Sequence, residues 1–277
     1  MINKIDAHQH FWQYSKQRYA WIDDKMLQLK RDFLPDDIFP IIQRNSVEGT
    51  VAVQAVQDEK ENFFLLELAE KHPFILAVIG WIDLKSPDLE TTLESYKNHK
   101  KLKGFRHVLQ DEADPNFILN QAFQNGLKSI FKAGFTYDLL VYPHQLDGAI
   151  QTVSNFEEGR FVLDHIAKPP IKAGLIKDWE VNIKALAERP NVYCKLSGMI
   201  TEAAWEDWDE KEFYPYLDVI MKAFGEDRVM FGSDWPVCKL AGSYEQVIGL
   251  VEGYLKGSST EVLEKVWRTN AINFYQL

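Results

Sequence analysis

Two histidines one residue apart, His8 and His10, follow a short apolar run near the start of the sequence. Alternate residues of a β-strand point to the same side, so we expect the two imidazoles to project together. His165 and Asp234 likewise end strand-like runs much later in the chain. Imidazole and carboxylate groups can bind a metal ion, move a proton or stabilise a developing negative charge. These four residues are candidates for a catalytic site, provided that the fold brings them together.

Eight strand-like runs alternate with stretches of helical periodicity. The strand-like runs occupy residues 4–10, 49–55, 76–83, 102–108, 136–142, 160–165, 192–198 and 228–235. Helical spacing is clearest in residues 58–72, 116–134, 215–225 and 243–255. Because strands that alternate with helices form parallel sheets, eight such units predict an α/β fold, a (β/α)8 TIM barrel forming a single domain over residues 1–277. The absence of a glycine-rich phosphate loop after any run disfavours a dinucleotide-binding sheet.

A (β/α)8 barrel carries its chemistry at the C-terminal ends of its strands. Strands 1 and 8 are neighbours in a closed barrel, so His8, His10 and Asp234 can converge there. His165 ends the sixth strand on the same rim. An unpaired imidazole after such an apolar run would be costly to bury, which favours a functional role for it. The predicted fold therefore places all four candidates around one mouth.

Other polar residues fall on the same predicted rim. Arg106 and His107 end the fourth strand and alternate in direction, so we expect one of them to point into the mouth. Asp164 is expected to face the other way, in a structural role. Lys195, on the seventh strand, is either an ion-pair partner inside the barrel or a functional group. His144 follows the fifth strand as a rim residue.

Composition narrows the class of protein and of partner. The formal net charge of −10 disfavours nucleic acid and anionic membranes as partners, and no apolar run reaches 18 residues. Because the first strand begins within a few residues of Met1, we expect no signal peptide and a cytoplasmic protein. Cys194 and Cys238 are expected to be buried free thiols. The aromatic segment from residue 11 to about 34 is expected to cover the mouth of the barrel.

The ordered set of motifs over residues 5–277 resembles the amidohydrolase superfamily, in the branch that includes the L-fucono- and L-rhamnono-lactonases. The motifs that carry this resemblance are DAHQHFW, GTVAVQA, KLKGFRHVLQDE, YDLLVYPHQL, FVLDHIAKPPI, YCKLSGM and FGSDWPVC. The resemblance implies a (β/α)8 barrel and the hydrolysis of a cyclic ester. It also implies that His8, His10, His165 and Asp234 occupy the family's site positions on strands 1, 6 and 8.

One departure from the family pattern concerns the metal. Zinc-dependent relatives place a histidine at the end of strand 5, where this sequence has Tyr142, and strand 4 ends without a glutamate or a lysine that could be carboxylated. These differences disfavour a binuclear site. They leave either one divalent ion on His8, His10 and Asp234, with zinc as the first candidate, or catalysis without a metal.

The resemblance predicts a small sugar-acid lactone as substrate. Asp234 would act as general base on a water molecule, and His8, His10 and His165, or a bound ion, would stabilise the oxyanion. Candidates for binding the sugar are Arg106, His107, Gln54, Trp81 and Trp235. Alternatives are a zinc-dependent decarboxylase or hydratase of the same branch, a TatD-like nuclease, and a non-catalytic barrel that binds sugar acids. The sequence leaves the oligomeric state open.

Overall fold

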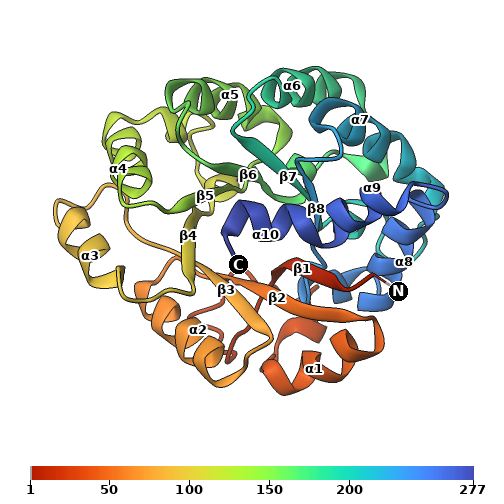
Figure 1. Cartoon of the computed structure of the whole chain (residues 1–277), viewed down its shortest axis with the longest axis horizontal. Helices are drawn as coiled ribbons and strands as arrows, with labels where there is room; N and C mark the ends of the chain where they lie inside the picture. Colours follow the sequence, from red (N-terminus) through yellow and green to blue (C-terminus); the bar gives the residue numbers. More distant parts are fainter. Residues whose placement is uncertain (1) are drawn as a thin grey trace.

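A closed ring of eight parallel strands forms the centre of the molecule in a computed structural model that describes residues 2–277 (Figure 1). The strands pair in chain order, from β1 to β8. Backbone hydrogen bonds from His10 N to Trp235 O and from Asp234 N to His8 O close the ring between β1 and β8. The (β/α)8 barrel predicted from the sequence is confirmed. The strands are β1 Lys4–Gln9, β2 Val47–Val53, β3 Ile75–Gly80, β4 Leu102–His107, β5 Thr136–Leu139, β6 Phe161–Leu163, β7 Val192–Leu196 and β8 Val229–Phe231.

The helices surround this ring, as Figure 1 shows. Local sequence signals set their ends. Asp58 caps α2 by accepting a hydrogen bond from Lys60 N, and Asn120 caps α4 through Ala122 N and Phe123 N. The helix expected from residue 116 therefore begins after this cap. The helices are α1 Pro35–Arg44, α2 Glu59–Lys71, α3 Leu89–Tyr96, α4 Gln121–Lys132, α5 Leu146–Asn155, α6 Lys177–Ala187, α7 Tyr214–Phe224, α8 Tyr244–Tyr254, α9 Thr260–Glu264 and α10 Asn270–Tyr275.

The N-terminal half of the barrel interior is apolar, and helix α10 closes the barrel at that end. Helix α10 lies across this end of the ring, with the C-terminus near its centre (Figure 1). Its Phe274 and Tyr275 pack on inward side chains from five strands. Each fully buried Val, Ile, Met or Phe side chain contributes about 1.5–3 kcal/mol to folding. The strand residues of this layer are Ile5, Ala7, Val51, Val53, Ala77, Ile79, Val162 and Met230.

All eight strands end one to four residues earlier than the sequence predicts, and three of these ends lie beside candidate site residues. β5 stops at Leu139 instead of residue 142, β6 at Leu163 instead of residue 165, and β8 at Phe231 instead of residue 235. Just beyond β6 and β8 the backbone leaves the extended region, because Asp234 and the residues from His165 to Lys168 have positive φ. The candidate residues His165 and Asp234 therefore lie on the loops immediately after their strands.

The segment between β1 and α1 packs beside the mouth of the barrel. Trp12 pairs with Phe33 in an antiparallel bridge, and its indole N–H donates to Arg31 O. The rings of Phe33 and Phe11 pack against the ring of Trp235, just beyond β8, in T-shaped pairs. This arrangement places the segment on the β1–β8 side of the mouth, at the end of the barrel that it was expected to cover.

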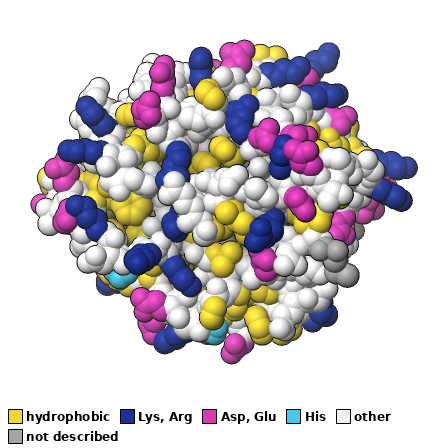
Figure 2. Space-filling model, in the orientation of Figure 1, with side chains coloured by type: hydrophobic (Ala, Val, Ile, Leu, Met, Phe, Trp, Pro, Cys, Tyr) yellow, Lys and Arg dark blue, Asp and Glu magenta, His cyan; other side chains and the backbone are white. Residues whose placement is uncertain are grey.

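The surface and the thiols agree with the composition. Figure 2 shows acidic, basic and apolar side chains interspersed over the face that carries α10, without a continuous basic patch on that face. None of the helices in residues 2–277 is long and apolar enough to cross a membrane. Cys194 and Cys238 are free and buried, as predicted.

A buried glutamate in α2 ties the segment between β1 and α1 to the loop after β2. Glu61 Oε2 accepts hydrogen bonds from Ala55 N and Val56 N, both at 2.9 Å, and Oε1 accepts one from the Tyr19 hydroxyl at 3.3 Å. Burial raises the pKa of Glu61 to about 7, against the opposing effect of these hydrogen bonds. The folded protein therefore holds this proton more tightly than the unfolded chain does.

This linkage predicts that Glu61 destabilises the fold as pH rises. The pKa of Glu61 is higher in the folded protein than in the unfolded chain. The contribution of protonated Glu61 to the free energy of unfolding is therefore lost as pH rises from about 4.5 to 7. Glu61→Gln keeps an oxygen for both backbone N–H groups and an amide for Tyr19. We expect the free energy of unfolding of the wild type to fall relative to this variant by about 1–3 kcal/mol from pH 5 to pH 8 in urea titrations. Parallel curves for the two proteins would contradict the assignment.

Candidate active site

A bulge in β1 aims both histidines at the barrel axis. Ile5 and Ala7 belong to the apolar interior, so a regular strand would next point Gln9 inward. The pairing of β1 with β2 shifts register between Asp6 and Gln9, which reverses the alternation at this point. His8 Nε2 and His10 Nε2 consequently lie 3.2 Å apart. The expectation that the two imidazoles project together is confirmed.

The structure brings all four candidate residues together. Asp234 Oδ1 lies 3.2 Å from His10 Nε2, 3.9 Å from His8 Nε2 and 4.0 Å from His165 Nε2. These side chains are buried, with at most 5% of any of them exposed. One carboxylate thus faces three imidazoles at the C-terminal end of the barrel, in a region where water screens charges poorly.

Left-handed backbone positions the two residues that lie on loops. Residues His165 to Lys168 have φ values between 47° and 59°, and Asp234 has φ of 57°. Non-glycine residues rarely adopt this region, and a run of four is costly, so the surrounding contacts must hold it in place. Gly198, after β7, passes so close that a Cβ there would lie 2.4 Å from His165 Nδ1. The strain and the close approach together fix where His165 points.

Hydrogen-bond partners constrain the proton positions on two of the imidazoles, and burial controls the charge of His8 and His165. His10 Nδ1 lies 2.8 Å from Val53 O, which can only accept, so this nitrogen carries a proton and donates. His165 Nδ1 pairs with Ser197 Oγ at 2.8 Å. Burial lowers the pKa of His165 to about 4 and that of His8 well below its usual value. His8 and His165 are therefore neutral at pH 7.

Three lone-pair atoms converge on one point and fit a divalent cation. In the tautomer with its proton on Nδ1, His10 directs the lone pair of Nε2 at Asp234 Oδ1. His8 Nε2 lies 3.2 Å from Arg106 Nη1, and a bound ion would take the place of this arginine at the one lone pair of that nitrogen. Facing acceptors repel one another unless a positive charge lies between them. Their separations of 3.2, 3.2 and 3.9 Å are close to the roughly 3.3–3.5 Å expected between tetrahedral ligands at bonds of about 2.0–2.2 Å. His8, His10 and Asp234 could therefore hold one ion.

Asp164 corrects one expectation from the sequence. It does not face away from the mouth, because its carboxylate lies inside the barrel, 2.9 Å from Arg106 Nη1, 3.0 Å from Lys195 Nζ and 3.3 Å from His8 Nδ1. β6 ends before Asp164, so strand alternation does not apply to it. Burial alone would raise the pKa of Asp164, but Lys195, His8 and Arg106 hold it well below the usual range. Asp164 is thus the ionised partner of two cations.

These cations disfavour a second metal ion nearby. His8, Asp164 and His165 also lie close enough together to ligate an ion. However, Arg106 and Lys195 already occupy both oxygens of Asp164. A metal there would have to displace two positive charges in a buried place. A site for a single ion therefore stays the prediction.

Lys195 is the interior ion-pair partner that the sequence allowed. Its Nζ lies 2.5 Å from Asp138 Oδ2 on β5, and this oxygen also accepts a hydrogen bond from the Tyr275 hydroxyl of α10 at 3.0 Å. Sequence reasoning missed Asp138, although a lone acid in the run TYDLL was a signal for an inward polar residue.

The residues predicted to bind sugar lie in three different environments. Arg106 points into the barrel and shares hydrogen bonds with Gln54, which is fully buried. His107 points away from the barrel axis, where its Nε2 pairs with Glu112 and its Nδ1 accepts from the indole N–H of Trp81. Trp235 is only 1% exposed. Of Arg106 and His107, only the arginine enters the mouth, and sugar binding by these five residues stays a prediction.

The loop after β5 supplies no ligand to the cluster. Tyr142 lies beyond the end of the strand and its ring stacks on His144, with centroids 6.0 Å apart. His144 is exposed, and neither of the ligand groups in residues 2–277 includes it.

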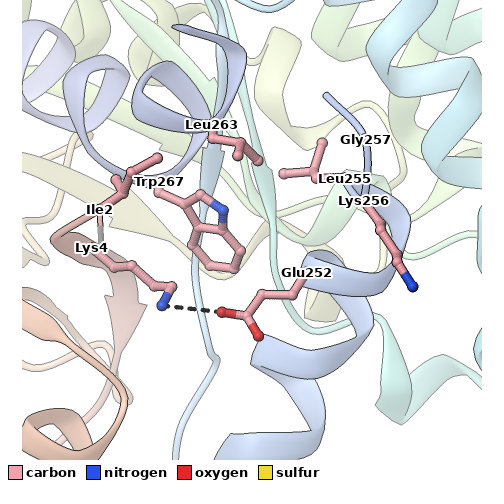
Figure 3. A pocket seen from close by; sticks show the side chains of 8 residues that line it. All are labelled: Ile2, Lys4, Glu252, Leu255, Lys256, Gly257, Leu263 and Trp267. Carbon is pink, nitrogen blue, oxygen red and sulfur yellow. Dashed lines mark ion pairs between the residues drawn. The ribbon is translucent and has the colours of Figure 1, made fainter. Parts of the chain in front are cut away.

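A hollow at the opposite end of the barrel is separate from this site. Figure 3 shows it between the start of β1, the end of α8 and Trp267, and its volume is about 260 Å³. The amine of Lys4 in its wall is already paired with Glu252 at 3.1 Å. Lys4 begins the strand whose other end carries His8 and His10. This end of a (β/α)8 barrel serves stability rather than chemistry.

Comparison with known proteins identifies the family to which this chain belongs. The chain matches the amidohydrolase family over residues 5–277, and it therefore belongs to that family. It is 39% identical to the L-fucono-1,5-lactonase of Burkholderia multivorans, an alignment that covers 99% of this chain and 96% of that protein. The L-fucono-1,5-lactonase of Burkholderia ambifaria is 37% identical, covering 88% of this chain and 84% of that protein. A crystal structure of a Burkholderia multivorans amidohydrolase with bound zinc has a TM-score of 0.96 and 38% identity, with 99% of both chains covered.

The convergent lone pairs predict one divalent ion per chain. Protein purified without chelator should contain about one equivalent by inductively coupled plasma mass spectrometry. His10→Ala should lower this content at least tenfold, because it removes a ligand, whereas His144→Ala, at an exposed site, should leave it unchanged. Two equivalents in the wild type, or full occupancy in His10→Ala, would show that this ligand set is wrong.

The close approach of Gly198 predicts a destabilised Gly198→Ala variant. An added Cβ would overlap His165, and alanine is strained at φ of 57°. We expect the free energy of unfolding to fall by about 1–3 kcal/mol in urea titrations. Gly249→Ala is the matched control, because no atom lies within 4 Å of its added Cβ and alanine favours the helix. Equal stability of the two variants would contradict this account of Gly198.

Proposed function

We propose that this protein is a hydrolase that opens a sugar-acid lactone, an aldonolactone such as L-fucono- or L-rhamnono-lactone. The observation that carries the proposal is the ionised carboxylate of Asp234 among three imidazoles at the mouth of the barrel. The 39% identity to an L-fucono-1,5-lactonase over nearly the whole chain supports the substrate class. A lactone is an activated ester, so one carboxylate base with nearby hydrogen-bond and metal sites suffices for its hydrolysis.

Asp234 is the general base in this proposal. Burial alone would raise the pKa of Asp234, but His165, His10 and His8 outweigh burial and hold it below the usual value. The carboxylate is therefore ionised at neutral pH. Its Oδ1 faces the imidazoles, which leaves Oδ2 to take a proton from water as the oxygen attacks the ring carbonyl. The bond from the carbonyl carbon to the ring oxygen then breaks, and Asp234 returns the proton to that oxygen as it becomes a hydroxyl group.

The cationic and imidazole groups around Asp234 stabilise the charge that develops on the carbonyl oxygen. His165 can donate from Nε2 when its Nδ1 accepts the Ser197 hydroxyl proton, and Arg106 brings a fixed positive charge to His8. We infer that zinc is the ion held by His8, His10 and Asp234, since the related amidohydrolase structure contains it. When bound, this ion supplies a Lewis acid for the carbonyl oxygen or the water.

Asp234→Asn tests the proposal, because the amide cannot take the proton. We expect the turnover of aldonolactones to fall at least about 10³-fold, measured as acid release on a lactone panel with and without chelator. Asp178→Asn, at an exposed site on α6, is the control and should retain full activity. Near wild-type turnover of Asp234→Asn would refute the general-base assignment. A wild-type protein that opens no lactone of the panel, with or without added zinc, would refute the proposed function.

A further inference from the structure

An ion pair between two loops borders the catalytic cluster on its β6–β7 side. Lys168 Nζ in the loop after β6 lies 3.5 Å from Glu202 Oε1 in the loop after β7. Their side chains are 17% and 21% exposed, so both are largely withdrawn from solvent yet still reachable. Lys168 Nζ also lies 5.7 Å from the centre of the Tyr142 ring. Sequence reasoning did not select either residue of the pair.

Both residues lie within electrostatic range of the reacting groups. Lys168 ends the left-handed run that begins at His165, and its positive charge adds to the effect of burial on that imidazole. Burial raises the pKa of Glu202, and the carboxylate of Asp234 adds to this shift while Lys168 opposes it. Lys168 follows His165 by three residues, and its ion pair with Glu202 joins the loop after β6, which carries His165, to the loop after β7.

Glu202 also forms part of the wall of a hollow of about 560 Å³. This volume lies within the range of small-molecule sites. Its lining residues come from the loops after β6 and β7, at the same end of the barrel as the catalytic cluster, and Lys168 is linked to this wall through its ion pair with Glu202. The other residues around it are Lys172, Thr201, Ala203, Ala204, Trp205, Glu206 and Asp207.

We propose that this hollow is the subsite for the hydroxyl-bearing part of the lactone, with Lys168 and Glu202 as its specificity-determining pair. The inference rests on the proposed function and names how the substrate is recognised. A sugar hydroxyl both donates and accepts, so an ammonium donor beside a carboxylate acceptor can bind two neighbouring hydroxyls. The pair is neutral as a whole, which suits an uncharged ring. Glu202, Glu206 and Asp207 outnumber Lys172 in the wall, which disfavours a lactone with carboxylate substituents.

Selectivity between two lactones tests the subsite. The probes are L-fucono-1,5-lactone, which carries the hydroxyls, and δ-valerolactone, which has the ring alone. In Glu202→Gln and Lys168→Met we expect kcat/KM to fall about 10- to 100-fold more for the sugar lactone than for δ-valerolactone. The surface ion pair Lys184–Glu180 on α6 is the matched control. Glu180→Gln and Lys184→Met should not change this ratio.

Three outcomes would count against the subsite, the proposed function or both. An unchanged ratio, or an equal loss on both lactones, would overturn the subsite, since the pair would then act only on the catalytic cluster or not at all. Binding of the sugar's 1,5-lactam, measured by calorimetry, separates the subsite from the proposed function. If the wild type opens no lactone yet binds the lactam at least tenfold more tightly than Glu202→Gln does, the subsite stands and the lactonase proposal fails. If it neither opens lactones nor binds the lactam, both fail.

Discussion

The rest of the site depends on the ion pairs that the buried carboxylate of Asp164 makes. It pairs with Arg106 from β4 and Lys195 from β7, and it lies beside His8 from β1. Removing one partner of a buried ion pair costs about 3–5 kcal/mol, so these segments must keep their mutual positions. Asp164, Asp138 and Asp234 are three buried carboxylates, and they face these two cations. The negative charge left over lies at the point where His8, His10 and Asp234 converge, which is where a divalent ion fits.

Much of the site was predictable because strand ends determine it. Residues that end parallel strands of a barrel meet on one rim, so the positions of His8, His10, His165 and Asp234 in the sequence were sufficient to group them. The direction of Asp164 was not predictable, because strand alternation fails where β6 gives way to left-handed backbone. The bulge in β1 was hidden too, since a register shift depends on pairing with β2 and not on the local sequence. Asp138 was missed because its partners, Lys195 and Tyr275, are distant in sequence.

The barrel divides into an apolar half and a charged half. Below, Ile5, Ala7 and their neighbours pack against α10 and make the ring rigid. Above, the polar groups are held by hydrogen bonds from backbone and from each other, such as those of His10 with Val53 and of His165 with Ser197. A rigid support of this kind keeps the imidazoles at fixed distances, which is what electrostatic catalysis needs because the groups then do not reorganise during reaction.

The contact of Tyr275 with Asp138 joins these halves and has a consequence for folding. The Tyr275 hydroxyl from α10 bonds the same oxygen that holds Lys195, and Lys195 in turn lies beside His8. Residues from opposite ends of the sequence therefore complete one charge network. Contacts between such distant residues form slowly. During synthesis, which proceeds from the N-terminus, β1 is made long before α10. Lys195, Asp138 and Asp164 therefore lack their full set of partners until α10 docks.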